Sequence, residues 1–142
     1  MASCPCGGAE FRSCCGPVVE DGVPARTAEQ LMRSRYTAFV LERPEHLWRT
    51  WHPRTRPETV LVGPLILGGR GLPGPGRFRG VGVGGLGGGL TILEVVAGGQ
   101  DDDDGVVDFE ARFTGPSGHE VMRERSEFRR RAGRWFYLGH AD

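Results

Sequence analysis

The four cysteines of this 142-residue chain lie close together near its start, at Cys4, Cys6, Cys14 and Cys15. Four thiolates at tetrahedral positions form the closed shell of a structural zinc site. Cys4 and Cys6 can bind from one tight turn, and Cys14 with Cys15 can complete the shell if the backbone turns sharply, which Gly16 favours. The spacing therefore predicts a metal knuckle that holds one Zn²⁺ per chain.

Two other interpretations of the four cysteines remain open, namely a pair of disulfides and a set of redox-sensing thiols. The chain opens with no apolar segment typical of a secretory signal, and it has no run of about 20 apolar residues. We therefore expect a cytoplasmic protein with reduced cysteines and no membrane segment. Its 18 basic and 18 acidic residues leave no net charge, so a nucleic-acid partner is not expected.

Helical patterns occupy the first part of the chain after the knuckle. Residues 18–26 are expected to form a polar connector. Thr27 and Gln30 make a capping box, which predicts a helix from there to about Leu41. Pro44 suits the first turn of a second helix that stops before Pro53, and residues 55–58 suggest a third, short helical turn.

The second half of the chain shows a glycine-rich segment followed by strand patterns. Residues 63–89 are almost half glycine, which favours a flexible surface insertion over an RNA-binding arm of the Arg-Gly type. Alternating apolar and polar residues then predict four antiparallel strands joined by short turns, at 90–96, 107–113, 119–130 and 134–138. Helices followed by an antiparallel meander predict an α+β fold.

Two resemblances sharpen this interpretation. The run from Cys4 to Cys15 resembles the SEC-C motif at the end of the bacterial preprotein translocation ATPase, with a loop one residue shorter than usual. This resemblance implies that all four cysteines bind one metal ion and that the knuckle contacts a protein partner. The second resemblance is to the YchJ family, also called UPF0225, and it is carried by residues 31–40, 50–53, 109–113, 124–128 and 133–137.

The YchJ resemblance implies a nuclear-transport-factor-2-like cone, in which N-terminal helices pack on a curved antiparallel sheet. The expected units are a SEC-C-like knuckle at 1–17 and the cone at 18–142, with the insertion at 63–89. The resemblance implies no particular activity.

A cone of this kind encloses a space at the wide end of its sheet, and seven residues are candidates to line it: Arg35, Tyr36, Trp51, His52, Arg112, Glu124 and Arg125. His52 and Glu124 could act as a general acid–base pair. Arg and Glu could instead form a structural network, or the space could bind a small molecule without chemistry. No catalytic residue is assigned. The expected function is a zinc-binding protein that acts as a protein-interaction or ligand-binding module, and the alternative is a small-molecule-binding domain or enzyme built around His52, Arg35 and Glu124.

Overall fold

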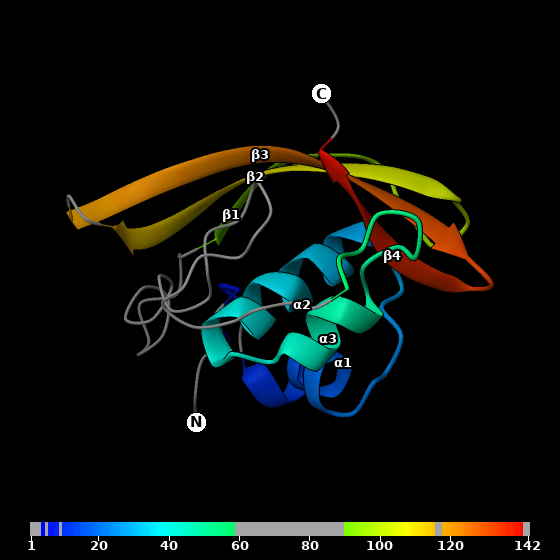
Figure 1. The fold of residues 1–142 in the computed structure, drawn as a ribbon, viewed down its shortest axis with the longest axis horizontal. Helices are drawn as coiled ribbons and strands as arrows, with labels where there is room; N and C mark the ends of the chain where they lie inside the picture. The colour runs from blue at the N-terminus through cyan, green and yellow to red at the C-terminus, as the bar shows by residue number, and fades with distance from the viewer. Residues whose placement is uncertain (1–3, 5, 9, 59–89, 116–117, 141–142) are drawn as a thin grey trace.

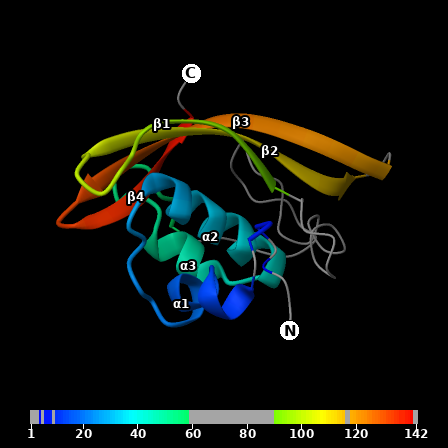
Figure 2. The same cartoon turned by 180° about the vertical axis from the view of Figure 1, so that it is seen from behind.

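Helices precede strands along the chain, as the sequence predicts. The structure is a computed structural model that describes residues 4, 6–8, 10–58, 90–115 and 118–140. Its elements are η1 (Phe11–Ser13), α1 (Gly16–Glu20), α2 (Ala28–Leu41), α3 (Pro44–Arg49), β1 (Leu90–Ala97), β2 (Asp104–Gly115), β3 (Gly118–Arg131) and β4 (Arg134–His140). The helices lie together on one face of a curved sheet (Figures 1 and 2). This arrangement confirms the predicted α+β fold.

Helix α2 begins at the predicted cap. The side-chain oxygen of Thr27 accepts a hydrogen bond from the Gln30 backbone N–H at 3.1 Å, which satisfies one of the free donors of the first turn. Gln30 in turn accepts from the backbone N–H of Arg26 at 2.6 Å, one residue before the capping residue. The helix ends where Glu42 adopts a left-handed conformation with φ of 59°. The predicted bounds of this helix are therefore confirmed.

Two local predictions on the helical side are wrong. Residues 16–20 form helix α1 where a polar connector was expected from Val18, because Pro17 suits a first helical turn and both Val18 and Val19 are buried. Residues 55–58 do not form a third helical turn. The Thr55 hydroxyl donates back to the His52 carbonyl at 3.4 Å, so it closes a turn behind it and does not cap a helix ahead.

The four strands form one antiparallel meander in the order β1-β2-β3-β4. Phe109 of β2 pairs with Glu124 of β3, and Phe128 of β3 pairs with Tyr137 of β4. Ala132 and Gly133 join β3 to β4 with φ angles of 52° and 79°, a combination typical of a tight hairpin turn. Edge strand β1 is more exposed than its apolar sequence suggests, since Leu93, Val95 and Val96 all face solvent.

Helix α2 lies at the centre of the molecule, in contact with α1, α3 and three of the four strands. It packs against the sheet on one side and against the cysteine-containing segment on the other. A single buried cluster includes side chains from the cysteine segment, from the helices and from the sheet. The largest fully buried side chains of this cluster include those of Leu31, Met32, Tyr36, Phe39, Phe109 and Phe128. Burying each such side chain contributes about 1.5 to 3 kcal/mol to folding. Because the cysteines belong to the same buried cluster, α2 connects the cysteine segment to the main core.

Three sequence predictions concern the limits of this fold. Residues 63–89, the predicted insertion, lie outside the residues that the structure describes. Within the described part of the chain, no helix has the length and apolar character needed to cross a bilayer. The division into units at 1–17 and 18–142 stays a prediction.

Candidate metal centre

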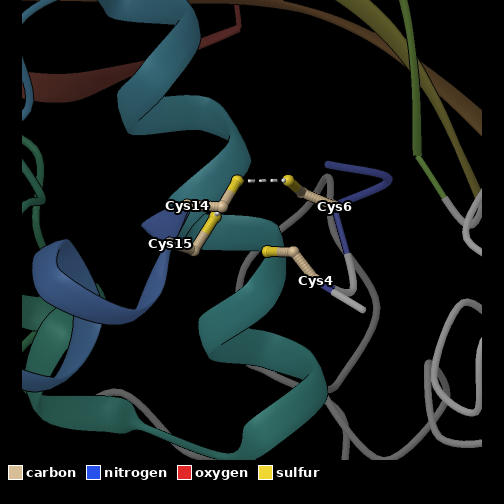
Figure 3. Close-up of side chains that lie close together, drawn as sticks. All are labelled: Cys4, Cys6, Cys14 and Cys15. Atoms are coloured by element: carbon tan, nitrogen blue, oxygen red, sulfur yellow. Dashed lines mark hydrogen bonds between the residues drawn. The ribbon is translucent and has the colours of Figure 1, made fainter. Parts of the chain in front are cut away.

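The structure brings the four cysteine sulfurs together in one cluster. Every pair of Sγ atoms lies within 4.8 Å. Cys6 Sγ is 3.5 Å from Cys14 Sγ, which in turn is 4.0 Å from Cys15 Sγ. Figure 3 shows the four side chains pointing toward one another beside helix α2. All four cysteines are free thiols, and their separations are far longer than the roughly 2.05 Å bond of a disulfide.

This cluster fits one tetrahedral metal ion. With metal–sulfur bonds of about 2.3 Å, a regular tetrahedron has sulfur–sulfur edges of about 3.8 Å. The distances of 3.5 and 4.0 Å lie on either side of that value. Cys4, Cys6 and Cys15 are buried and Cys14 is half-buried, so the protein itself could fill all four coordination positions. The four cysteines could therefore hold one metal ion in a closed shell.

Two short turns position the sulfurs. In the first, the Gly7 backbone N–H donates to the Cys4 carbonyl at 3.0 Å, which folds the chain so that Cys4 and Cys6 face the same point. In the second, Cys15 is the N-cap of α1, and its carbonyl accepts the first helical hydrogen bond from Val19 at 2.8 Å. The start of a helix is the sharp change of direction that lets Cys14 and Cys15, although adjacent, both face the cluster.

Two glycines allow the turns to approach each other closely. A Cβ atom on Gly8 would lie 2.6 Å from Cys14 Sγ, and one on Gly16 would lie 2.6 Å from the Phe11 carbonyl oxygen. Real Cβ atoms do not approach other heavy atoms so closely, so a larger residue at position 8 would force the two turns apart, and one at position 16 would push the start of α1 away from η1. Gly16 thus contributes by its small size, whereas the sequence suggested only that it favours a sharp turn.

Without a cation, the protein favours only part of the thiolate charge that a metal shell requires. Hydrogen bonds from Cys15 and Cys6 hold the pKa of Cys4 well below its usual range. The same hydrogen bond to Cys4, together with burial, raises the pKa of Cys15. Burial and the nearby Cys6 raise the pKa of Cys14 to about 12. A divalent cation at the centre would offset the repulsion among the four thiolates and lower the pKa values of Cys14 and Cys15. Metal binding is therefore coupled to the release of their protons.

Helix α2 also contacts the cluster through two residues that sequence reasoning did not assign to it. Arg33 Nη1 donates to the Cys6 carbonyl at 2.9 Å and lies 3.8 Å from Cys6 Sγ. Thr37 Oγ1 lies 3.7 Å from Cys4 Sγ. The spacing of four residues between Arg33 and Thr37, which places both on one helix face, was the available signal.

Among the predicted pocket residues, Arg35 and Trp51 come together around Tyr137. The Arg35 side chain is fully buried, and its guanidinium carbon lies 5.0 Å from the Trp51 ring centroid and 4.5 Å from that of Tyr137. Arg35 Nη1 donates to the Leu47 carbonyl at 2.9 Å and to the Thr50 hydroxyl at 2.8 Å. Burial lowers the pKa of Arg35 to about 10. Its guanidinium thus fills space between α2, α3 and β4.

Glu124 joins the same region from the sheet. Its Oε2 accepts hydrogen bonds from the Tyr137 hydroxyl at 3.0 Å and from the Ser126 hydroxyl at 2.5 Å. Burial, followed by the charge of Glu124, raises the pKa of Tyr137 above its usual range, so the phenol remains a hydrogen-bond donor. Tyr137 therefore links the buried Arg35 to the buried Glu124. This arrangement is a structural network of the kind that the sequence left as one alternative. Tyr36, which follows Arg35 on α2, is also buried.

The other three pocket candidates do not join this group. His52 has its ring 5.9 Å from that of Phe136, and its Nδ1 accepts from the Arg54 backbone N–H at 3.1 Å. Phe136 precedes Tyr137 in β4, and successive side chains of a strand point to opposite faces. The geometry therefore does not pair His52 with Glu124 as a general acid and base.

The same alternation separates Arg125 from Glu124. Arg125 Nη1 donates to Glu94 at 2.8 Å and to Asp108 at 3.4 Å on the outward side of the sheet. Arg112 is also partly exposed, and its Nη1 donates to the Thr91 hydroxyl at 3.0 Å. The expectation that Arg112, Glu124 and Arg125 line one space was wrong, because it ignored the two-residue period of a strand.

Comparison with known proteins places the chain in a family. The family model described as "YchJ, middle NTF2-like domain" matches residues 27–62 and 88–140. A UPF0225 protein of Chromobacterium violaceum is 39% identical over 138 residues, covering 96% of this chain and 90% of that protein. A UPF0225 protein of Methylibium petroleiphilum is 40% identical over 135 residues, covering 95% and 85%. The chain belongs to the YchJ (UPF0225) family. The match of the YchJ domain begins at the cap of α2, so the cysteine cluster lies ahead of it.

Two solved structures share the fold. The solution structure of a SEC-C motif containing protein from Rhodopseudomonas palustris superposes with a TM-score of 0.66 at 24% identity, covering 96% of this chain and 94% of that one. The crystal structure of a SEC-C motif containing protein from Psychrobacter arcticus gives a TM-score of 0.63 at 24% identity, covering 96% and 80%. At this identity both likenesses concern the fold alone.

Proposed function

We propose that the four cysteines hold one structural Zn²⁺ ion. The observation that carries this proposal is the cluster of four Sγ atoms, all within 4.8 Å of one another and with spacings close to the edges of a zinc–thiolate tetrahedron. Thiolate ligands in tetrahedral geometry favour zinc or iron over magnesium or calcium, which prefer oxygen ligands. Because four protein ligands leave no position for water or substrate, the ion's role is structural and not catalytic.

Metal analysis of protein purified without chelator tests the proposal. We expect close to one zinc per chain and four thiols that react with an alkylating reagent only after the zinc is removed. A colourless, folded protein without metal, whose four thiols react at once, would contradict it. Stoichiometric iron with visible absorption would contradict zinc while retaining the metal site.

We propose further that the knuckle is a protein-interaction module of a cytoplasmic protein. The closed shell supports this role, since it leaves no open position for chemistry at the ion. Between the two cysteine pairs the chain exposes Gly7, Arg12 and Ser13, which leaves this loop accessible to a partner. The resemblance to the SEC-C motif points in the same direction, and reduced thiols fit the cytoplasm.

Site-specific crosslinking tests the interaction. A photoreactive residue placed at Ser13 should capture a partner in bacterial cells, while the same residue at Val121, exposed on the sheet, should not. Capture at Ser13 should disappear in the variant Cys4→Ser, Cys6→Ser. Equal capture at both positions, or capture that persists in the double variant, would contradict a role for the metal-loaded knuckle.

One observation supports a second proposal, that the cone also binds a small molecule. A cavity of about 90 Å³ lies between the α1–α2 connection, α3 and β4, with Arg49 and Arg134 among the residues that line it. Ligand pockets for drug-sized molecules are about 300 to 1,000 Å³, so this cavity suits only a small anion. A thermal-shift series with acetate, phosphate and sulfate tests the idea. A rise with one anion that Arg49→Ala abolishes would support it, and no rise would contradict it.

A further inference from the structure

Helix α2 presents two hydrogen-bonding side chains to the cysteine cluster from a single face. Arg33 and Thr37 are four residues apart, so they project from the same side of the helix. Thr37 Oγ1 reaches Cys4 Sγ at 3.7 Å, and Arg33 Nη1 reaches Cys6 Sγ at 3.8 Å. Each of the two sulfurs in the first turn therefore has its own polar neighbour on α2. The pairing ties the whole first turn to the helix.

The charge of a loaded site explains why such neighbours matter. Four thiolates around one divalent cation carry a net charge of about −2, and buried charge is costly unless it is paired or hydrogen-bonded. The Arg33 guanidinium supplies a positive charge beside Cys6. The Thr37 hydroxyl can donate a hydrogen bond to a Cys4 thiolate without adding a charge. Donors of this kind orient metal ligands and adjust how strongly they bind.

Arg33 is held in place from both ends. Its Nε donates to Glu29 Oε2 at 3.0 Å, one helical turn earlier, while its Nη1 donates to the Cys6 carbonyl at 2.9 Å. The guanidinium therefore cannot turn away from the knuckle without breaking contacts at both ends. Thr37 is completely buried, so its hydroxyl has no access to bulk water. Both side chains are thus positioned before a metal arrives.

We propose that Arg33 and Thr37 are positioning residues of the metal centre, which hold the sulfurs of Cys6 and Cys4 and offset the negative charge of the loaded shell. This inference rests on the proposed function of the four cysteines. Metal affinity then depends on helix α2 as well as on the knuckle. It follows that metal binding and the stability of the cone are coupled. Bound metal strengthens the packing of α2 against the knuckle, and loss of metal loosens it.

Three variants test the two contacts against a matched control. Arg33→Met removes the charge and both hydrogen bonds to the knuckle. Thr37→Val removes only the hydroxyl and preserves the buried shape, and Thr37→Ser restores a hydroxyl. Arg12→Met is the control, since it removes one positive charge from an exposed residue between the two cysteine pairs. Circular dichroism checks that each variant keeps the helix and strand signal of the wild type.

Zn²⁺ affinity is measured by competition with a chromogenic chelator, and the Co²⁺-loaded proteins are compared by absorption. We expect Arg33→Met to weaken Zn²⁺ binding by about 10- to 100-fold. We expect Thr37→Val to weaken it less, Thr37→Ser to recover the loss, and Arg12→Met to match the wild type. The sulfur-to-cobalt charge-transfer band should shift in Arg33→Met and Thr37→Val, because hydrogen bonds to a thiolate change its donor strength.

The outcomes separate this inference from the proposed function. If the wild type binds no metal, the proposed metal site fails and this inference fails with it. If the wild type binds zinc but Arg33→Met and Thr37→Val match it in affinity and cobalt spectrum, only the inference is overturned. A weakened affinity with an unchanged cobalt spectrum would also overturn it, since Arg33 would then support only the backbone through the Cys6 carbonyl.

Discussion

The guanidinium carbon of Arg35 lies 4.5 Å from the ring centroid of Tyr137, deep between the helices and the sheet. A fully buried arginine is unusual, because removing its charge from water is costly unless other groups compensate. Here the compensation comes from the aromatic faces of Trp51 and Tyr137, from the Leu47 carbonyl and from the Thr50 hydroxyl. The network joins α2, α3 and β4.

We expect Arg35→Met to lower the free energy of unfolding by about 3 kcal/mol, because it leaves the acceptors around the guanidinium without their donor. Urea unfolding followed by circular dichroism measures this change. Arg54→Met is the control, since Arg54 is exposed and its replacement should change stability by less than about 0.5 kcal/mol. A loss as small as that of the control would show that the buried network does not stabilise the fold.

A pH dependence is expected from His46, which is 2% exposed. The Ser34 hydroxyl donates to the Leu31 carbonyl at 2.8 Å, so its oxygen accepts from His46 Nε2 at 2.9 Å. Burial, followed by the charges of nearby arginines, lowers the pKa of His46 from 6.5 to about 3. Between these values the unfolded chain binds more protons than the folded one. The contribution of His46 is therefore complete above pH 6.5 and decreases as the pH falls toward 3.

At one pH unit below 6.5, the stability lost through His46 amounts to about 1.4 kcal/mol of the free energy of unfolding. We expect the wild type to lose that much more stability than His46→Gln when the pH is lowered from about 7.5 to 5.5. Urea unfolding of both proteins at both pH values measures the difference, and any effect of metal release cancels in the comparison. Identical pH dependence of the two proteins would show that His46 does not stay neutral in the folded state.

Closure of the knuckle is expected to depend on Gly8. Because a Cβ atom there would lie 2.6 Å from Cys14 Sγ, Gly8→Ala should push the two cysteine pairs apart and weaken metal binding at least tenfold. Chelator competition measures the affinity. The control is Gly99→Ala, whose Cβ would meet its nearest atom at 3.4 Å in the β1–β2 turn, far from the cysteines in sequence. Equal affinities for the two variants would contradict the close approach.

Loss of the metal ligands should loosen the molecule without unfolding it. We expect the variant Cys4→Ser, Cys6→Ser to bind no metal, to keep most of its helix and strand signal, and to melt at a lower temperature than the wild type. The wild type treated with a chelator should melt at a similarly lowered temperature, because both changes remove the same stabilising ligand. Complete unfolding of the double variant would show that the cone cannot fold without the metal, and an unchanged melting temperature would show that the knuckle is detached from it.

Local patterns were enough to predict helix α2, the four strands and the grouping of the four cysteines. The Thr27–Gln30 signal marks the start of α2, and alternation of side chains marks the strands, because caps and strand periods depend on neighbouring residues. The Cys4–Cys6 and Cys14–Cys15 pairs are likewise close in sequence. Their meeting around one point required only two short turns. The predicted knuckle and the α+β order therefore followed from the chain itself.

Tertiary packing decided what surrounds these elements. Arg33 looks like a solvent-facing helix residue until the knuckle folds against α2 and brings Cys6 to it. Glu124 has no evident partner in the sequence until β4 pairs with β3 and brings the Tyr137 hydroxyl to its carboxylate. In the same way, the His52 ring packs against the ring of Phe136 and not against Glu124. Such contacts join residues far apart in the chain, so they depend on which faces of separate elements meet, and no short sequence pattern records that choice.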